Sequence, residues 1–360
     1  MSNSTTLSGL KREDFKRVVN GKETDLYVLA NSNGIELAVT NFGCAILSWM
    51  APDRNGKMAN IIQGHDSLDH LMNSEVSVLS TTIGRYGNRI ANGRFTLDGR
   101  TYTLEQNNGK NSLHGGSGGF HKRIWDLVKQ THDTLVFHYE SHDGEEGFPG
   151  CLHIEMSYAL TEDNALSIQY QATTDKRTIV NLTNHAFFSL SGIGNPTPSA
   201  ENNIVTINAD YYLPTDNTSI PTGEILKVTG TPMDFRTPHV ISERINDPFE
   251  QLIFGKGYDH CYVLNKVEAG EMSFAASCTD PQSGRTLEVF TTEPGLQFYT
   301  ANWNNGMTGA LGSTYPDRSA VCFEAQHFPD TPNRSYFPTV VLNPGEQYAQ
   351  TTIYKIGIQK

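Results

Sequence analysis

Strict alternation of apolar and polar residues is the feature that most constrains the fold of this chain. From Leu152 to Leu160 every second residue is apolar, and the alternation returns from Leu166 to Ala172. A period of two places the apolar side chains on one face of an extended strand, whereas a helix needs a period of about 3.6. The residues between the two stretches, Glu162-Asp163-Asn164, favour a turn. We therefore predict an antiparallel hairpin with one buried face.

Similar patterns recur along the chain. Asp98-Gly99 separates residues 94–97 from residues 100–104, which predicts a second hairpin. Further strands are predicted at residues 37–49, 134–140, 204–209, 286–291 and 348–356. Only residues 66–79 and 240–254 have the spacing of short helices, and Pro248 interrupts the second.

These elements predict an all-β fold, a single large β-sandwich with a few short helices. Strands do not alternate with helices, and no glycine-rich phosphate loop opens a helix, which argues against a nucleotide-binding α/β fold. We find no repeat or low-complexity linker that would divide the chain. The expectation is one domain over residues 1–360, with residues 1–20 as an N-terminal extension or first strand region.

The net charge of -12 and the pI near 5.4 oppose binding to nucleic acid or to anionic membranes, which requires clustered Lys and Arg. The N-terminus has no apolar stretch suited to a signal peptide, and no run reaches membrane-spanning length. Five cysteines are scattered without a CxxC pair, so no disulfide framework is predicted. We expect a cytoplasmic protein without a nucleic-acid or membrane partner, either a monomer or a homodimer.

Polar residues crowd with glycines and aromatics at a few places where the alternation breaks. These polar islands are residues 82–90, 111–116, 181–188, 257–262, and 293–303 together with 323–330. Such a mixture suits a sugar, because hydroxyls need converging hydrogen-bond partners while the C–H faces of the ring lie against aromatic side chains. The aromatic candidates are Phe187, Phe298, Trp303 and Phe328. A small monosaccharide is the expected ligand.

Seven blocks of the sequence, in this order, resemble those of the aldose 1-epimerases, also called galactose mutarotases. The blocks are GRYGNRIANGRF, NSLHGG, NLTNHAFFSLSG, YYLPTDNTSIPTGEI, YDHCYVL, EPGLQFYT and FEAQHFPDTPN. The resemblance extends from about Phe42 to the C-terminal strand. It implies a β-supersandwich, no cofactor, and interconversion of the α and β anomers of free aldoses such as galactose or glucose.

The resemblance also implies roles for individual residues. Glu324 would be the base at the C1 hydroxyl, His185 the acid at the ring oxygen, and His114 would steady the same oxygen. Asn88 and Arg89 would hold ring or C1 oxygens, Asp259 would bind remote hydroxyls, and Gln297 would be a polar neighbour of Glu324. An ionised glutamate and an imidazolium would give a bell-shaped pH profile, falling at low pH as the carboxylate protonates and at high pH as the imidazole deprotonates.

Other interpretations stay open at this point. His185 could be a core histidine, Asp259 a turn residue, and Glu324 with Arg89 a structural ion pair. The whole chain could act on a sugar 6-phosphate, could be a glycoside hydrolase that uses Asp259 and Glu324, or could be a non-catalytic carbohydrate-binding module. We predict no metal site, and the preferred aldose is not determined by the sequence.

Overall fold

The computed structural model describes residues 5–359, and antiparallel strands are its main regular elements. The largest sheet has nine strands, and their pairings are antiparallel. Its order is β12 (Asp126–Gln130), β13 (Thr134–Ser141), β14 (Leu152–Leu160), β15 (Ala165–Thr174), β30 (Tyr348–Ile358), β24 (Arg285–Thr291), β23 (Ser273–Thr279), β18 (Ile204–Ile207) and β21 (His239–Val240).

Two smaller sheets accompany the large one. The five-stranded sheet has the order β20 (Leu226–Lys227), β19 (Tyr211–Tyr212), β22 (Asp259–Val263), β25 (Gly295–Tyr299), β28 (Cys322–Gln326). The four-stranded sheet has the order β3 (Leu26–Ala30), β4 (Glu36–Thr40), β5 (Ile46–Pro52), β6 (Met58–Asn60).

Short ladders and helices complete the described residues. The two-stranded ladders are β1 (Arg17–Val19) with β2 (Lys22–Thr24), β7 (Thr82–Ile83) with β17 (Thr183–Asn184), β8 (Arg89–Ile90) with β11 (Ser112–Leu113), β9 (Arg94–Leu97) with β10 (Arg100–Thr103), β16 (Thr178–Ile179) with β29 (Val341–Leu342), and β26 (Met307–Thr308) with β27 (Thr314–Tyr315). The α-helices are α1 (Leu68–Met72) and α2 (Glu250–Gly255). The 3₁₀ turns are Arg12–Asp14, Ala91–Gly93, Phe120–Lys122, Glu145–Gly147, Ile241–Glu243, Ala310–Gly312 and Thr331–Asn333.

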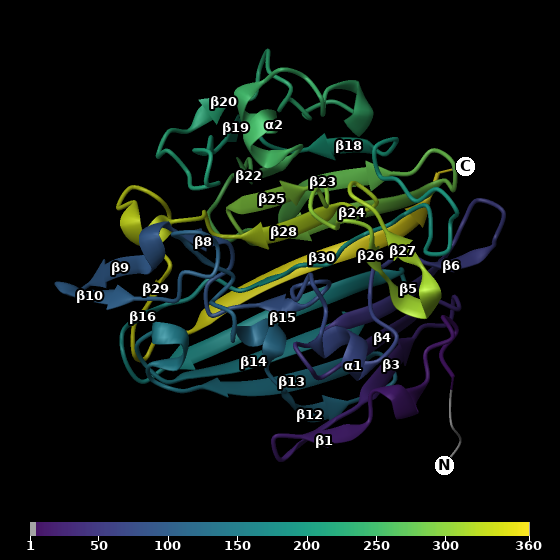
Figure 1. The fold of residues 1–360 in the computed structure, drawn as a ribbon, viewed down its shortest axis with the longest axis horizontal. Helices are drawn as coiled ribbons and strands as arrows, with labels where there is room; N and C mark the ends of the chain where they lie inside the picture. Colours follow the sequence, from purple (N-terminus) through teal and green to yellow (C-terminus); the bar gives the residue numbers. More distant parts are fainter. Residues whose placement is uncertain (1–4, 360) are drawn as a thin grey trace.

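Strand β30 lies in the middle of the large sheet, between β15 and β24 (Figure 1). It is eleven residues long. On one side it pairs with β15, from Ala172↔Tyr348 to Ala165↔Lys355, and on the other side it pairs with β24, from Thr291↔Thr352 to Arg285↔Ile358. The segment furthest along the chain therefore joins the two halves of this sheet.

All three sheets contribute side chains to one large cluster of buried apolar residues. Phe188 lies between Trp49 of β5 and Tyr354 of β30, with ring centroids 6.4 and 5.0 Å away. The Tyr354 hydroxyl donates to the carbonyl oxygen of Phe323 in β28, at 2.6 Å. One core thus connects all three sheets, as in the predicted β-sandwich with few short helices.

Most predicted strands are confirmed, including both hairpins, but one prediction was wrong. Residues 37–49 form two strands, β4 and β5, rather than one. The turn between them needs Gly43, which has φ 60°, and a Cβ on it would lie 2.4 Å from the carbonyl oxygen of His121. The predicted helices at residues 66–79 and 240–254 shrink to α1 and to α2 with a 3₁₀ turn, and α2 begins after Pro248. No helix among residues 5–359 is long and apolar enough to cross a membrane.

Candidate active site

The polar islands meet at one cavity of about 690 Å³. Every island supplies at least one lining side chain, although two of these residues, Asn88 and Glu324, are 236 positions apart in sequence. The predicted residues that line the cavity are Asn88, Arg89, His114, His185, Phe187, Asp259, Trp303 and Glu324.

An imidazole and a carboxylate face each other in this cavity. Nε2 of His185 lies 3.5 Å from Oε1 of Glu324, and their side chains are 6% and 2% exposed. This separation exceeds that of a good hydrogen bond, so the two groups face one another without being locked together. Nδ1 of His185 and Oε2 of Glu324 are buried and have no hydrogen-bond partner in the described protein. Buried polar atoms without partners are costly, and they indicate a site where a ligand supplies the missing hydrogen bonds.

Backbone pairing fixes both groups. His185 follows β17; its amide donates to the carbonyl oxygen of Thr81 at 2.9 Å, and its carbonyl accepts from the amide of Ser80 at 3.1 Å. Glu324 is the central residue of β28, in which all five residues are buried. The imidazole ring also stacks on Phe187, with centroids 4.8 Å apart and planes 10° apart. The pair is therefore held on rigid elements rather than on loose loops.

His114 lies beside His185, with ring centroids 5.2 Å apart. Its amide donates to the carbonyl oxygen of Asn88, and its Nδ1 accepts from the amide of Asn88, both at 3.1 Å. Because Nδ1 is an acceptor, the neutral ring carries its proton on Nε2 and can donate from there. His114 and Asn88 both have positive φ, 54° and 63°, so the reciprocal pair holds each in a left-handed conformation.

A second group of polar side chains comes from neighbouring strands of the five-stranded sheet. Gln297 of β25 stands opposite Glu324 of β28 in the ladder, and its Nε2 donates to Oδ1 of Asp259 at 2.6 Å. Arg89 approaches the other oxygen of Asp259, at 3.9 Å, and its Nε donates to Asn108 at 3.0 Å. Arg89 is thus paired with Asp259 rather than with Glu324, unlike the structural ion pair considered above. Gln297 contacts Asp259 but does not itself line the cavity.

Burial sets the protonation of the facing pair. Burial raises the pKa of Glu324 well above its ordinary value; the charge of Asp259 raises it further, and Arg89 opposes this. Burial lowers the pKa of His185 to about 4; its backbone hydrogen bond and the charge of Asp259 oppose this, while the charge of Arg89 lowers the pKa further. Burial likewise lowers the pKa of His114 well below the usual range. The free site therefore favours a protonated carboxyl and a neutral imidazole, the reverse of the ionised pair expected from the sequence.

Only two of the four predicted aromatic residues line the cavity, Phe187 and Trp303. Phe298 was predicted wrongly: it packs in the core, with its ring 5.3 Å from that of Phe323. Neighbouring residues of a strand point to opposite faces, so the face that presents Gln297 turns Phe298 away. Phe328 was also wrong, because it packs on Phe337 in a separate apolar cluster.

Several lining residues were not singled out from the sequence. Tyr299 packs edge-on against His185, with centroids 6.1 Å apart, and His121 is a third buried histidine, with a pKa that burial lowers to about 4. Asn217, Thr218 and Ser219 form another part of the wall. These three lie within the block YYLPTDNTSIPTGEI, which was noted above without assigning a role to any residue in it.

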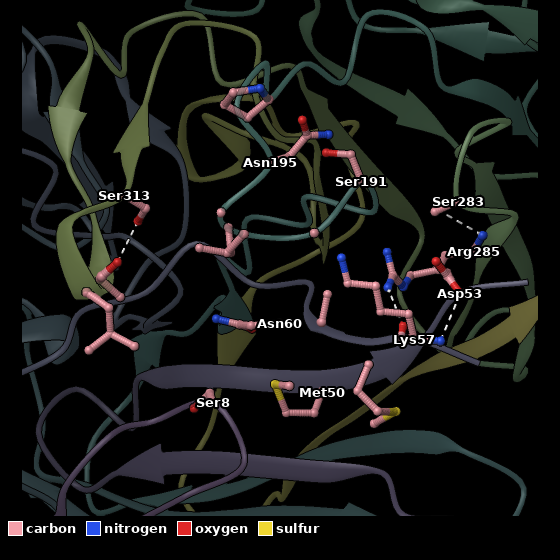
Figure 2. Close-up of a pocket in the computed structure, with 18 of the residues that line it drawn as sticks. Ser8, Met50, Asp53, Lys57, Asn60, Ser191, Asn195, Ser283, Arg285 and Ser313 are labelled. Atoms are coloured by element: carbon pink, nitrogen blue, oxygen red, sulfur yellow. Dashed lines mark hydrogen bonds between the residues drawn. The ribbon is translucent and has the colours of Figure 1, made fainter. Parts of the chain in front are cut away.

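A larger cavity, of about 1010 Å³, shares no lining residue with the first (Figure 2). Arg285 lines this larger cavity, and its guanidinium donates to the carbonyl oxygens of Leu190, Lys57 and Ala51 at 2.9, 3.1 and 3.3 Å. Its Asp53 accepts from two backbone amides. The described residues around it include neither histidine nor glutamate, so they lack a pair for proton transfer at neutral pH. The two cavities therefore differ in the chemistry of their linings, and the larger one lacks the facing imidazole and carboxylate.

The sequence model of the family described as aldose 1-epimerase matches residues 25–355. The chain belongs to the aldose 1-epimerase family. The galactose mutarotase of Bos taurus is 39% identical over 91% of this chain and 92% of its own length. The Homo sapiens galactose mutarotase is 37% identical over 98% and 100%, and the aldose 1-epimerase of Escherichia coli K12 is 37% identical over 93% and 96%.

Solved structures agree with this assignment. An aldose epimerase homologue from C. elegans has a TM-score of 0.86 at 29% identity and covers 94% of this chain and 100% of its own. A galactose 1-epimerase from Lactobacillus acidophilus has a TM-score of 0.82 at 26% identity, with 96% and 97% covered. Family membership and the galactose mutarotase-like fold, both expected from the seven blocks, are confirmed.

Proposed function

We propose that this protein interconverts the α and β anomers of a free aldose such as galactose or glucose. The observation that carries the proposal is the facing of His185 Nε2 and Glu324 Oε1 across 3.5 Å in a buried cavity, each with a further polar atom that lacks a partner. Relatives of this family carry the names galactose mutarotase and aldose 1-epimerase.

The reaction needs one base and one acid. Glu324 takes the proton from the C1 hydroxyl while His185 gives a proton to the ring oxygen, and the bond between C1 and the ring oxygen breaks. The open-chain aldehyde rotates about the C1–C2 bond. The two groups then act in the opposite direction: His185 recovers its proton from the C5 hydroxyl as the ring closes, and Glu324 returns its proton to the oxygen on C1.

The reaction is neutral overall, so the facing pair holds a single shared proton throughout. In the free site burial keeps that proton on the carboxyl. A bound sugar places hydroxyl groups against both side chains and stabilises their charged forms, which allows the proton to move to His185 before the ring opens. His114 donates a hydrogen bond from its Nε2 to the ring oxygen of the sugar, next to His185.

The remaining side chains position the ring. Asp259 offers its carboxylate to hydroxyls remote from C1, held by Gln297 at one oxygen and approached by Arg89 at the other. Phe187 and Trp303 offer apolar surfaces to the C–H faces of the sugar. Positioning of this kind can supply a large part of the rate gain.

Local charge favours a neutral sugar over a sugar 6-phosphate. The cavity is lined by the acidic Glu75, Asp259 and Glu324 against the basic Arg89 and Lys122, and Arg89 is already paired with Asp259. A phosphate dianion needs an excess of cationic donors. For the hydrolase alternative, the presence of two histidines next to Glu324 is unexplained, since that mechanism uses two carboxyl groups.

Polarimetry of freshly dissolved anomers tests the proposal. Wild-type protein should speed the change in optical rotation of α-galactose or α-glucose, and sugar 6-phosphates should be poorer substrates. Glu324→Gln, which keeps the shape of the side chain, should lower kcat by at least about 10³-fold while equilibrium binding of galactose persists. Release of the aglycone from aryl glycosides without any catalysed mutarotation would instead support a hydrolase, and sugar binding without catalysis would support a binding module.

We also propose that the chain acts as one domain in the cytoplasm. The family match spans residues 25–355, and unpaired cysteines suit a reducing compartment. A monomer or homodimer, and a reaction without metal or cofactor, remain predictions. The ligand atoms of His114, His185 and Glu324 lie within 4.8 Å of one another, so the absence of a metal requirement needs its own test.

A further inference from the structure

Metal-ligating side chains gather at a second place, on the outer face of the nine-stranded sheet. Buried and accessible residues alternate along β13 and β14, which puts His138 and Glu140 of β13 and His153 of β14 on the solvent side. Glu140 stands directly opposite His153 in the ladder. His142 and Cys151 continue the same alternation just beyond the ends of the two strands. The sequence pattern is H-x-E-x-H at the end of β13 and just after it, and C-x-H at the start of β14 and just before it.

The side chains of this cluster already approach one another. The two oxygens of Glu140 lie 3.1 Å from Nδ1 of His142 and 3.3 Å from Nδ1 of His153. Sγ of Cys151 lies 4.0 Å from Nε2 of His153. One ligand atom from each of Glu140, Cys151 and His153 falls within 4.8 Å of the other two. In a tetrahedral zinc site, neighbouring ligand atoms are about 3.3–3.6 Å apart, so small side-chain rotations would complete the geometry.

The backbone around the thiol is fixed. The amide of Cys151 donates to the carboxylate of Asp175 at 2.7 Å, and its carbonyl oxygen accepts from the hydroxyl of Thr174 at 3.1 Å. The carboxylates of Asp175 and Glu140 therefore lie near this cysteine, and their negative charge would stabilise a cation bound there.

Cross-strand ion pairs alone explain the cluster poorly. Exposed pairs of this kind contribute little to stability, so the contacts of Glu140 with His142 and His153 do not by themselves account for the cluster. Ion pairs between Glu140 and the two histidines also leave the thiol of Cys151 without a role. Of the five cysteines, Cys151 alone is not fully buried.

We propose that Cys151, His153 and Glu140 bind a zinc ion on the outer face of the sheet, with His142 available as a fourth ligand. Thiolate, imidazole and carboxylate together are the donor set of Zn²⁺, whereas Mg²⁺ and Ca²⁺ prefer oxygen ligands alone. The ion would tie β13 to the start of β14. The site is separate from the cavity that holds His185 and does not depend on the proposed function.

Cobalt substitution tests the site. All titrations use the Glu324→Gln background, so that the histidine cluster of the cavity is disabled as a competing site. Co²⁺ added to metal-free protein should produce a sulfur-to-metal charge-transfer band in the near ultraviolet, which one equivalent of Zn²⁺ abolishes. Cys151→Ser should lose the band, and His153→Asn should weaken Zn²⁺ binding by about tenfold or more.

A matched control and a second readout keep the test decisive. His132→Asn removes an exposed histidine outside the cluster and should leave the band and the affinity unchanged. In native protein, alkylation should occur mainly at Cys151, and Zn²⁺ should slow it. The proposal is overturned if Co²⁺ gives no charge-transfer band, if the band survives Cys151→Ser, or if Zn²⁺ leaves the alkylation rate of Cys151 unchanged.

Discussion

Acidification should leave kcat/KM of this protein unchanged until His185 takes up a proton, near pH 4. In the free site the shared proton sits on Glu324, so the active form is lost at low pH by protonation of the imidazole. It is lost at high pH when the carboxyl, whose pKa is raised, gives up its proton. The two limbs of the pH profile are thus assigned in the opposite order to the one expected from the sequence.

Magnitudes decide between the two arrangements of the proton. Two unit charges 3.5 Å apart attract by about 5 kcal/mol at an effective dielectric of about 20. Lowering the pKa of His185 from 6.5 to about 4 corresponds to about 3 kcal/mol against its charged form. The remaining ~1 kcal/mol of attraction is smaller than the several kcal/mol needed to bury a carboxylate that has one oxygen without a partner. The arrangement with a protonated Glu324 and a neutral His185 is therefore the more stable one until a sugar binds.

Initial rates of mutarotation at two temperatures measure this assignment, after subtraction of the buffer-catalysed reaction. Ionisation of an imidazole has a large enthalpy and ionisation of a carboxyl has almost none. The low-pH limb should therefore move with temperature while the high-pH limb stays in place. His185→Asn should be slower by about 10²–10⁴-fold and should lack the low-pH limb. A temperature-sensitive limb on the alkaline side, or a low-pH limb that persists in His185→Asn, would refute the reasoning.

Three further outcomes are expected. Asp259→Asn should weaken galactose binding by about 10–150-fold, the loss of a charged hydrogen bond, with a smaller change in kcat; isothermal titration and steady-state kinetics separate the two effects. Incubation with EDTA should leave mutarotation unchanged, and a loss that added Zn²⁺ restores would contradict the prediction that catalysis needs no metal. Phe298→Ala should destabilise the protein by about 3–5 kcal/mol in urea unfolding, because its ring packs in the core; a loss of sugar binding without a loss of stability would contradict this position.

The sequence pattern predicted the strands that have one buried face. It did not predict the features that depend on contacts between segments distant in sequence. Alternation located β14 and β15, but the turn at Gly43 depends on the close approach of His121, which is 78 positions away. The same alternation, applied to Gln297, would have excluded Phe298 from the cavity. The resemblance selected the polar residues that converge, yet the protonation of His185 and Glu324 follows from burial by segments distant in sequence. No local pattern encodes that burial.

The central position of β30 has a consequence for biosynthesis. This strand leaves the ribosome after every other strand of the nine-stranded sheet, so until then β15 and β24 each present an open edge with unpaired amides and carbonyls. At this stage the nascent chain has two partial sheets whose exposed edges can pair with other chains, so we expect chaperones to bind it. A premature stop codon before Tyr348 would consequently yield an aggregating polypeptide rather than a shortened enzyme.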